Sequence, residues 1–382
     1  MDDRQLLGTN RVITALAVCV AAALACGPGD HSGQDKAVSD GKQAPPDKKE
    51  AKKEPPPPEP WVWQIPQGLK EPPIPEDNPM TKAKVELGHK LFMDKRLSGD
   101  GSRSCYSCHQ NELGNADGRK TALGAGDKPL TRNTPTIWNV GYFAEHYWDG
   151  RAAGLEKQMI GAWKGGNMGV GDDLAAKAGE IGHLPEYRAA FVDVFGLKAD
   201  EKATPEQIAQ AISAYERTLL CGDTAYDAST MDEAAQRGWE TFRDRGCRTC
   251  HEGDNFSDGK YHNVGVGVPT KGDGPDLGRG KVSSNAEDNH KFRTPTLRNV
   301  AKTAPYFHDG SVATLEEAVR YMAGGGNRKA PGLDPNLQDL KLDDAQIKDL
   351  VAFLEALSCP GSLEVIGDQT VAGIPEEATT PG

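Results

Sequence analysis

Two short segments pair cysteines with a histidine at a spacing that could hold an iron porphyrin. Residues 105–109 read Cys-Tyr-Ser-Cys-His, and residues 247–251 read Cys-Arg-Thr-Cys-His. Two thiols at this spacing reach the two vinyl groups of one porphyrin, and the histidine that follows presents its imidazole to the iron. The motifs therefore predict two covalently bound haem c groups. The attachment and ligand residues are expected to be Cys105, Cys108, His109, Cys247, Cys250 and His251.

Cysteine pairs at this spacing also occur in zinc sites and in thioredoxin-like redox centres. A Cys₄ zinc site would combine the two pairs, but each pair is followed directly by histidine. A thioredoxin-like pair expects a βαβ context, which the sequence does not suggest. Haem attachment is the favoured interpretation. Because this attachment takes place outside the cytoplasm, it also predicts an exported protein.

The N-terminal residues have the composition of an export signal. Arg4 and Arg11 precede an apolar run over residues 12–25, which is too short to span a bilayer comfortably. Residues 23–27 read Ala-Leu-Ala-Cys-Gly and are similar to a bacterial lipoprotein cleavage box. We expect residues 1–26 to be a lipoprotein signal peptide and Cys26 to carry the lipid, which would be the only membrane attachment of a periplasmic protein. An ordinary signal peptide is the alternative.

Composition separates both ends of the chain from its middle. Residues 27–60 are charged and proline-rich, which predicts a disordered linker, and residues 361–382 are expected to form a flexible tail. The chain carries 44 Lys+Arg against 56 Asp+Glu, a formal net charge of −12. This charge argues against non-specific nucleic-acid binding, which needs a cationic surface.

The middle of the chain repeats itself with a constant offset. The segment Thr-Pro-Thr-Ile-Trp-Asn-Val at residues 134–140 returns as Thr-Pro-Thr-Leu-Arg-Asn-Val at residues 294–300. Each copy follows one haem motif, so the repeat predicts two related haem domains, over residues 61–220 and 221–360. Apolar residues at three- and four-residue spacing predict helices. These cover residues 82–92, 205–219, 234–243, 315–321 and 343–357.

The intervening segments are rich in Gly, Pro and Asn and are expected to form long ordered loops around the haems. The fold class predicted is mainly α, with two tandem cytochrome c-like haem domains. Together these features resemble the bacterial di-haem cytochrome c peroxidase and MauG family, over residues 75 to 358. The motifs that carry the resemblance are residues 87–98, the two C-x-x-C-H motifs, and residues 132–136, 148–151, 295–299 and 304–310.

The resemblance implies a division of labour between the two haems. Peroxide would react at the haem held by His109, and electrons would arrive at the haem held by His251. Met322 would be the second iron ligand of the latter, since the peroxidases have Met there and the MauG branch has Tyr. Thioether ligation raises the haem potential, which suits an electron acceptor. Tyr321 is the alternative ligand, and Trp148 matches the family's electron relay between the haems.

The resemblance also implies a calcium ion at the domain interface. Asn133, Thr303 and Pro305 match the family's calcium ligands, and their amide and carbonyl oxygens are donors that Ca²⁺ accepts. The two remaining cysteines, Cys221 and Cys359, lie at the start of the second domain and after its last helix. A leftover pair outside the cytoplasm usually bonds, which predicts a disulfide; two buried thiols are the alternative.

The sequence departs from the family on the peroxide side of the first haem. Gln158 matches the family's glutamine, but Asn167 stands where the family carries a glutamate. An amide can hydrogen-bond to peroxide but cannot exchange a proton at neutral pH, which places fast turnover in doubt. Glu145 and Glu156 are nearby carboxylates that could replace the missing group.

The second departure concerns the position of an iron-blocking histidine. Residues 110–145 contain no histidine, whereas many peroxidases place one there. The iron of the first haem would then be open, with His146 as an alternative ligand or as a packing partner of Trp148.

The sequence predicts a di-haem peroxidase that reduces hydrogen peroxide to water. Its electrons would come from a small cytochrome c or a cupredoxin. Two other functions are kept: a MauG-like oxidase that uses peroxide on a partner protein, and an electron carrier or sensor with weak peroxidase activity, which Asn167 favours. Members of the family are often homodimers, and the sequence does not decide the oligomeric state.

Overall fold

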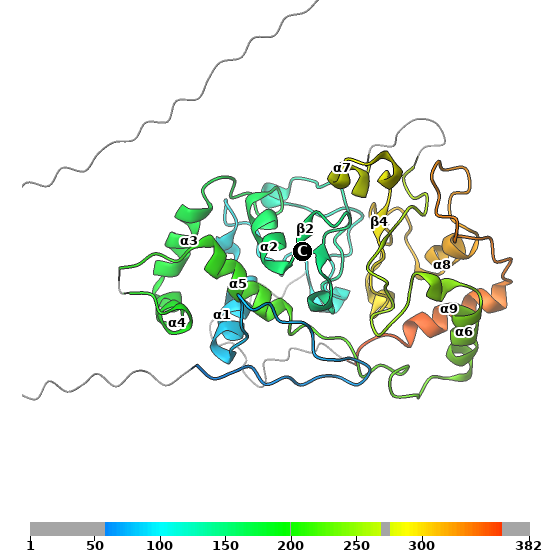
Figure 1. Ribbon diagram of the computed structural model, residues 1–382, viewed down its shortest axis with the longest axis horizontal. Helices are drawn as coiled ribbons and strands as arrows, with labels where there is room; N and C mark the ends of the chain where they lie inside the picture. Colours follow the sequence, from blue (N-terminus) through cyan, green and yellow to red (C-terminus); the bar gives the residue numbers. More distant parts are fainter. Residues whose placement is uncertain (1–57, 199, 269–275, 361–382) are drawn as a thin grey trace, which may run out of the picture. The chain divides into compact units, whose positions relative to one another are not determined.

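The computed structural model describes residues 58–198, 200–268 and 276–360 (Figure 1). These residues belong to one compact unit. The predicted signal peptide, Cys26, the linker up to residue 57 and the tail from residue 361 lie outside the described residues. Within the linker predicted to end at residue 60, Glu59 accepts a hydrogen bond from the Lys82 backbone N–H, and Pro60 forms a bridge with Thr81.

The described residues are mainly helical, as the sequence predicts. The first half contains α1 (Lys82–Met93), α2 (Leu155–Lys164), α3 (Leu174–His183), α4 (Pro185–Phe195) and α5 (Pro205–Glu216). The second half contains α6 (Glu233–Asp244), α7 (Arg279–Ser283), α8 (Leu315–Ala323) and α9 (Asp344–Glu355). All five predicted helices are present, and α2, α3, α4 and α7 are additional. Figure 1 shows α1 to α5 gathered on one side, and α6, α8 and α9 on the other.

Strands are few and short. The strand β1 (Glu145–His146) pairs antiparallel with β2 (Ala152–Ala153), and β3 (Tyr261–His262) pairs antiparallel with β4 (Phe292–Arg293). Single 3₁₀ turns occupy Lys95–Leu97, Asn111–Leu113, Ala125–Asp127, Val140–Tyr142, Cys247–Thr249, Ala286–Asp288 and Val300–Lys302. The connecting segments are therefore long loops, in agreement with the prediction.

Each half is built on one close helix crossing. In the first, Gly88 of α1 faces the Ala211 carbonyl of α5 so closely that a Cβ would not fit. In the second, Gly238 of α6 faces the Asp349 carbonyl of α9 in the same way. One turn beyond each glycine, two aromatic rings meet. The ring centroids are 5.1 Å apart for Phe92 and Tyr215, and 5.0 Å apart for Phe242 and Phe353.

The loops repeat as well as the helices. Asn139 and Asn299 both adopt left-handed backbone angles, with φ of 58° and 60°. The Asn139 N–H donates to the Leu219 carbonyl and the Asn299 N–H donates to the Leu357 carbonyl, at 2.8 and 2.9 Å. Each bond ties the loop after a haem motif to the residues that directly follow the last helix of its domain. The duplication read from the sequence is thus a duplication of structure.

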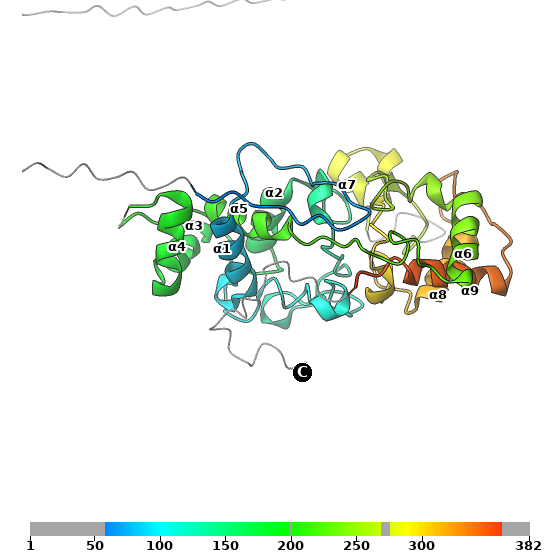
Figure 2. The ribbon, with the colours of Figure 1, turned by 90° about the horizontal axis from the view of Figure 1, so that it is seen from below.

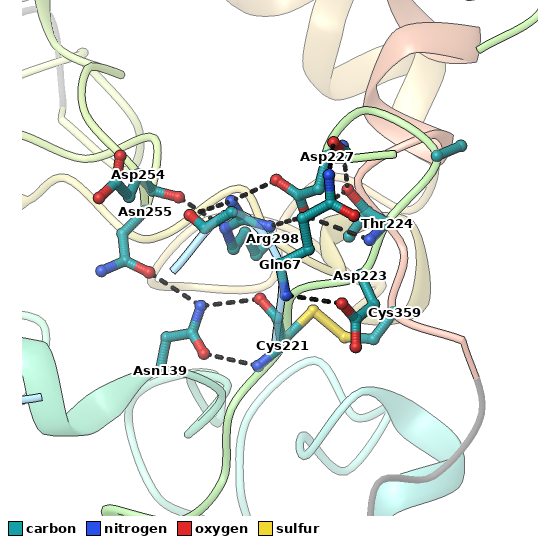
Figure 3. A network of polar contacts seen from close by, with 12 residues as sticks. Gln67, Asn139, Cys221, Asp223, Thr224, Asp227, Asp254, Asn255, Arg298 and Cys359 are labelled. Carbon is teal, nitrogen blue, oxygen red and sulfur yellow. Dashed lines mark hydrogen bonds and ion pairs between the residues drawn. A yellow bond between two sulfur atoms is a disulfide. The ribbon is translucent and has the colours of Figure 1, made fainter. Parts of the chain in front are cut away.

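The two halves meet at a polar junction, shown in Figure 3. Cys221 and Cys359 form the predicted disulfide, which closes 138 residues. Beside it, the guanidinium of Arg298, 1% exposed, binds both carboxylate oxygens of Asp227 at 2.7 and 2.9 Å. Asn139 of the first half donates to the Asn255 side chain of the second at 2.8 Å.

The segment before α1 contacts both halves. Asn78 donates to Gln210 of α5 and to Glu156 of α2. Farther back, the Gln67 N–H donates to the Asp223 carboxylate at 2.6 Å, and the Asp223 N–H donates to the Gln67 carbonyl at 3.0 Å, in the second half. Figure 2 shows this segment, in blue, running alongside helices of the first half.

Candidate functional site

The first haem motif forms a tight turn, and a hydrogen bond fixes the orientation of its histidine ring. The N–H groups of Cys108 and His109 both donate to the Cys105 carbonyl at 3.1 Å. The Nδ1 atom of His109 lies 3.0 Å from the Asn115 carbonyl, so this nitrogen carries the proton and Nε2 is the atom free to bind iron. Neither cysteine is disulfide-bonded, which leaves both thiols available for thioether bonds.

The second motif has the same geometry. The His251 N–H donates to the Cys247 carbonyl at 3.0 Å, and His251 Nδ1 lies 2.9 Å from the Phe256 carbonyl. Burial lowers the pKa of both His109 and His251, which favours the neutral imidazole that ligates metals.

A cavity of about 300 Å³ opens at the second motif. Cys247, Cys250, His251 and Met322 of α8 all line it. Tyr321, the alternative ligand, is absent from the described lining, and its hydroxyl donates to the Val264 carbonyl at 2.9 Å. Met322 is therefore placed on the wall of the His251 cavity.

Arg293 supplies a test of whether the cavity fits a haem. Its side chain lines the cavity, and its Nε and Nη1 atoms are buried with no hydrogen-bond partner among the described residues. Burial lowers the pKa of this guanidinium to about 10. A buried guanidinium whose N–H groups lack acceptors is costly, and a haem carries propionates that a guanidinium binds well. The cavity, its cysteines and Arg293 together fit a haem c.

Trp148 lies between helix α2 of the first half and the cavity of the second haem motif. Its indole N–H donates to the Asn133 carbonyl at 2.9 Å, and its side chain lines the His251 cavity. The preceding residue, Tyr147, donates its hydroxyl to the Gln158 carbonyl of α2 at 2.9 Å. The chain at 147–148 thus connects the helix that carries Gln158 with the cavity of the second motif.

Gln158 and Asn167 come from α2 and from the turn that follows it. Both side chains are half-buried, and the Asn167 carbonyl accepts the Ala125 N–H at 3.1 Å. This bond ties the loop after the first haem motif to the end of α2. An amide at each position can orient a ligand by hydrogen bonding, but neither can exchange a proton at neutral pH.

Neither carboxylate expected to replace the family's glutamate is free to move. Glu156 binds Arg217 at 2.8 and 3.1 Å and accepts from Asn78 at 2.7 Å. Glu145 accepts from the Tyr261 hydroxyl at 2.7 Å and from Arg279 at 3.2 Å. Both groups are committed to ion pairs that hold elements together.

His146, the alternative ligand of the first haem, is buried in strand β1. Burial lowers its pKa to about 4, and within the described part of the chain its Nδ1 atom has no hydrogen-bond partner. The imidazole is therefore neutral at physiological pH.

The residues expected to bind calcium share one location. Asn133, Thr303 and Pro305 all line the cavity of the second motif. Asn133 Nδ2 donates to the Arg119 carbonyl at 2.8 Å, which leaves its side-chain oxygen as a possible ligand.

Three functional-looking groups were not identified from the sequence. Cys250, Asp258 and His262 form a cluster with metal-ligand chemistry, but Cys250 belongs to the haem motif. His262 instead contacts two carboxylates, Asp334 at 2.6 Å and Asp258 at 3.1 Å. The other two groups are Arg293 and Glu216, single residues outside any motif, and no local pattern marks them.

Among residues 58–198, 200–268 and 276–360, no helix has the length and apolar content that crossing a bilayer requires.

The comparisons with known proteins agree with this architecture. The profile of the di-haem cytochrome c peroxidase family matches residues 82–235, and that of cytochrome c matches residues 235–358. Cytochrome-c peroxidase IdrP1 of Denitromonas iodatirespirans is 40% identical over 322 residues, which cover 75% of this chain and 84% of that protein. Methylamine utilization protein MauG of Methylorubrum extorquens is 35% identical over 295 residues, covering 75% and 81%.

One solved structure extends the comparison to three dimensions. A MauG-like protein associated with microbial copper homeostasis aligns with a TM-score of 0.73 and 33% identity, over 78% of this chain and 96% of that one. Two helical domains, each with a C-x-x-C-H turn and a hydrogen-bonded histidine, define a two-haem c-type cytochrome. The chain belongs to the di-haem cytochrome c peroxidase family, and it is an oxidoreductase of that family with two c-type haems.

Proposed function

We propose that this protein reduces hydrogen peroxide to water with electrons from a small cytochrome c or a cupredoxin. The observation that carries the proposal is the position of Met322 on the wall of the His251 cavity, while Tyr321 is bonded elsewhere. A thioether ligand gives a haem of high potential, which suits a site that accepts electrons from such donors. The haem iron, when bound, supplies the redox chemistry.

The residues of the chain divide into two groups. His109 would hold the haem at which peroxide reacts, and the amides of Gln158 and Asn167 would orient the peroxide. His251 and Met322 would hold the haem that receives electrons, and Trp148 would relay electrons between the sites. Trp148 is suited to this because its segment contacts both the Gln158 helix and the His251 cavity.

Calcium binding and location complete the proposal. Asn133, Thr303 and Pro305 would hold Ca²⁺ beside the cavity, where they lie together. We place the protein in the periplasm because covalent haem attachment occurs outside the cytoplasm. The lipid anchor at Cys26 and a homodimer stay predictions.

A MauG-like oxidation of a partner protein is the second candidate. The similarity to MauG and to a MauG-like structure favours it, whereas Met322 argues against it. An electron carrier or sensor is the third candidate, favoured by Asn167 in place of a glutamate.

Rapid mixing separates these functions. The holoprotein with both haems loaded is reduced by one electron and mixed with hydrogen peroxide, and reduced cytochrome c is then supplied. Fast reaction with sustained oxidation of the cytochrome is the expected result. A covalent change in an added partner protein without such turnover would favour the MauG-like oxidase. Slow or absent reaction would overturn the peroxidase and favour the carrier.

A further inference from the structure

Glu216, the last residue of α5, is a buried carboxyl group that nothing yet described employs. The residue is 6% exposed. Its Oε2 atom is buried and has no hydrogen-bond partner within the described chain. Carboxyl groups are rarely buried without a partner, because an unpaired charge in such a place is strongly disfavoured.

The one cation beside Glu216 along the chain is already engaged. The guanidinium of Arg217 binds Glu156 through two hydrogen bonds, at 2.8 and 3.1 Å. Burial raises the pKa of Glu216 to about 8. The positive charge of Arg217 acts to lower this pKa, and the negative charge of Glu156 acts to raise it further. At neutral pH the carboxyl carries a proton, in contrast to Glu156, whose hydrogen bonds hold its pKa below the usual range.

Glu216 lies close enough to the first haem motif and to Tyr147 for its charge to act on both. Burial raises the pKa of the Cys105 thiol and of the Tyr147 hydroxyl, and the charge that Glu216 carries when it is ionised raises both further. Cys105 anchors the first haem, and Tyr147 is hydrogen-bonded to the Gln158 carbonyl. The carboxyl thus lies within electrostatic range of both the haem attachment point and the segment that bears the distal glutamine.

The elements packed against the end of α5 define the charges around this group. Helix α2 contributes Glu156. Helix α1 contributes His89, whose ring lies 4.9 Å from that of Tyr215, and Lys84, which donates to the Asn78 side chain at 2.9 Å. Glu145 and Glu156 are both held in ion pairs, whereas Glu216 Oε2 has no hydrogen-bond partner among the described residues.

We propose that Glu216 stores the proton for the peroxide-reacting haem, which Asn167 cannot supply. The inference rests on the proposed peroxidase function. Reduction of H₂O₂ to two H₂O breaks the O–O bond and takes up two electrons, from the donor protein, and two protons. Glu216 gives one of these protons to the departing oxygen as water forms. Solvent supplies the second proton and also the proton that the Glu216 carboxylate then regains.

The test compares three substitutions in the holoprotein. Glu216→Gln keeps the shape but removes the exchangeable proton, and Glu216→Asp restores a carboxyl. Glu206→Gln, an exposed position in the first turn of α5, is the matched control. We expect the rate of reaction with peroxide to fall by roughly 100-fold in Glu216→Gln, to recover in part in Glu216→Asp, and to stay unchanged in Glu206→Gln.

The pH dependence has a definite sign. Glu216 is protonated below about pH 8 and loses its proton above it. The wild-type rate should therefore decline as the pH rises through about 8, whereas the rate of Glu216→Gln should be low and independent of pH in this range. A Glu216→Gln protein with the wild-type rate and profile would overturn the proposal.

Sodium fluoride gives a readout that does not require turnover. Fluoride on a ferric haem is stabilised by a nearby group that donates a hydrogen bond, so its affinity for the first haem should weaken above pH 8. Glu216→Gln should remove this dependence and Glu206→Gln should keep it. If the wild type shows the fluoride dependence but no peroxide turnover, the peroxidase function fails and the assignment of Glu216 stands.

A measurement on the wild type alone guards against a variant that does not fold. The infrared spectrum of the holoprotein should contain the C=O band of a protonated carboxyl at pH 7, lost as the pH rises through about 8. A spectrum without this band would overturn the proposal.

Discussion

At the scale of single residues, two adjacent side chains on α8 are the candidates for the second iron ligand beside His251. Met322 lines the His251 cavity, and Tyr321 donates its hydroxyl to the Val264 carbonyl. The chain thus offers both side chains at neighbouring positions, and the helical rotation of about 100° between neighbours decides which one faces the cavity.

Replacing Met322 by His tests this assignment. A second imidazole should lower the midpoint potential of the His251 haem, and the near-infrared absorption of a thioether-bound ferric haem should disappear. Donor-driven turnover should fall with the potential. Redox titration and absorption spectra of Met322→His and of the control Tyr321→Phe provide the measurement. Unchanged spectra in Met322→His, or the loss of the band in Tyr321→Phe, would contradict the assignment.

At the scale of elements, one glycine in each domain allows two helices to pack closely. These are Gly88 between α1 and α5, and Gly238 between α6 and α9. Gly238→Ala should destabilise the fold by roughly 1–3 kcal/mol, because its Cβ would strike the Asp349 carbonyl and force α6 and α9 apart. Gly179→Ala in α3 is the control: its Cβ would meet only the Lys202 side chain, at 3.1 Å. Denaturant unfolding measures both. Equal unfolding midpoints for the two variants would mean that the crossing tolerates the methyl group.

The sequence predicted the helices that carry both an apolar stripe and a capping residue. Thr204 and Thr314, for example, form capping boxes at the starts of α5 and α8. The helices α2, α3 and α4 were missed because no side chain caps their first turns, and α7 was missed because it has only five residues. Two predicted ends ran too far, at residues 219 and 357. There the carbonyls of Leu219 and Leu357 accept hydrogen bonds from distant asparagines, which no local pattern contains.

Some residues of the candidate site could also be predicted from the sequence, and others could not. The haem motifs and Met322 could be found because a fixed spacing or a family position marks them. Arg293 and Glu216 could not, because their importance comes from burial without a partner, and burial is created only by the fold.

At the scale of the whole molecule, the disulfide is a covalent cross-link between residues 138 positions apart. Opening the 138-residue loop between Cys221 and Cys359 should lower the free energy of unfolding by roughly 2–5 kcal/mol. Urea unfolding of the oxidised and the reduced protein measures this difference, and the haem spectra should stay unchanged because both haem motifs use other cysteines. In the double variant Cys221→Ala/Cys359→Ala, added reductant should have no effect. Identical midpoints for the oxidised and the reduced wild type would contradict the prediction.

The same bond shows how the second haem domain is inserted in the chain. The Cα atoms of Cys221 and Cys359 lie 5.3 Å apart, so the chain enters and leaves this domain at nearly one point. Ends this close allow a domain to be circularly permuted, because a short loop can join them while new ends open elsewhere. In evolutionary terms, adjoining ends are typical of a domain that can be gained or duplicated as one piece, which agrees with the duplication seen in this chain.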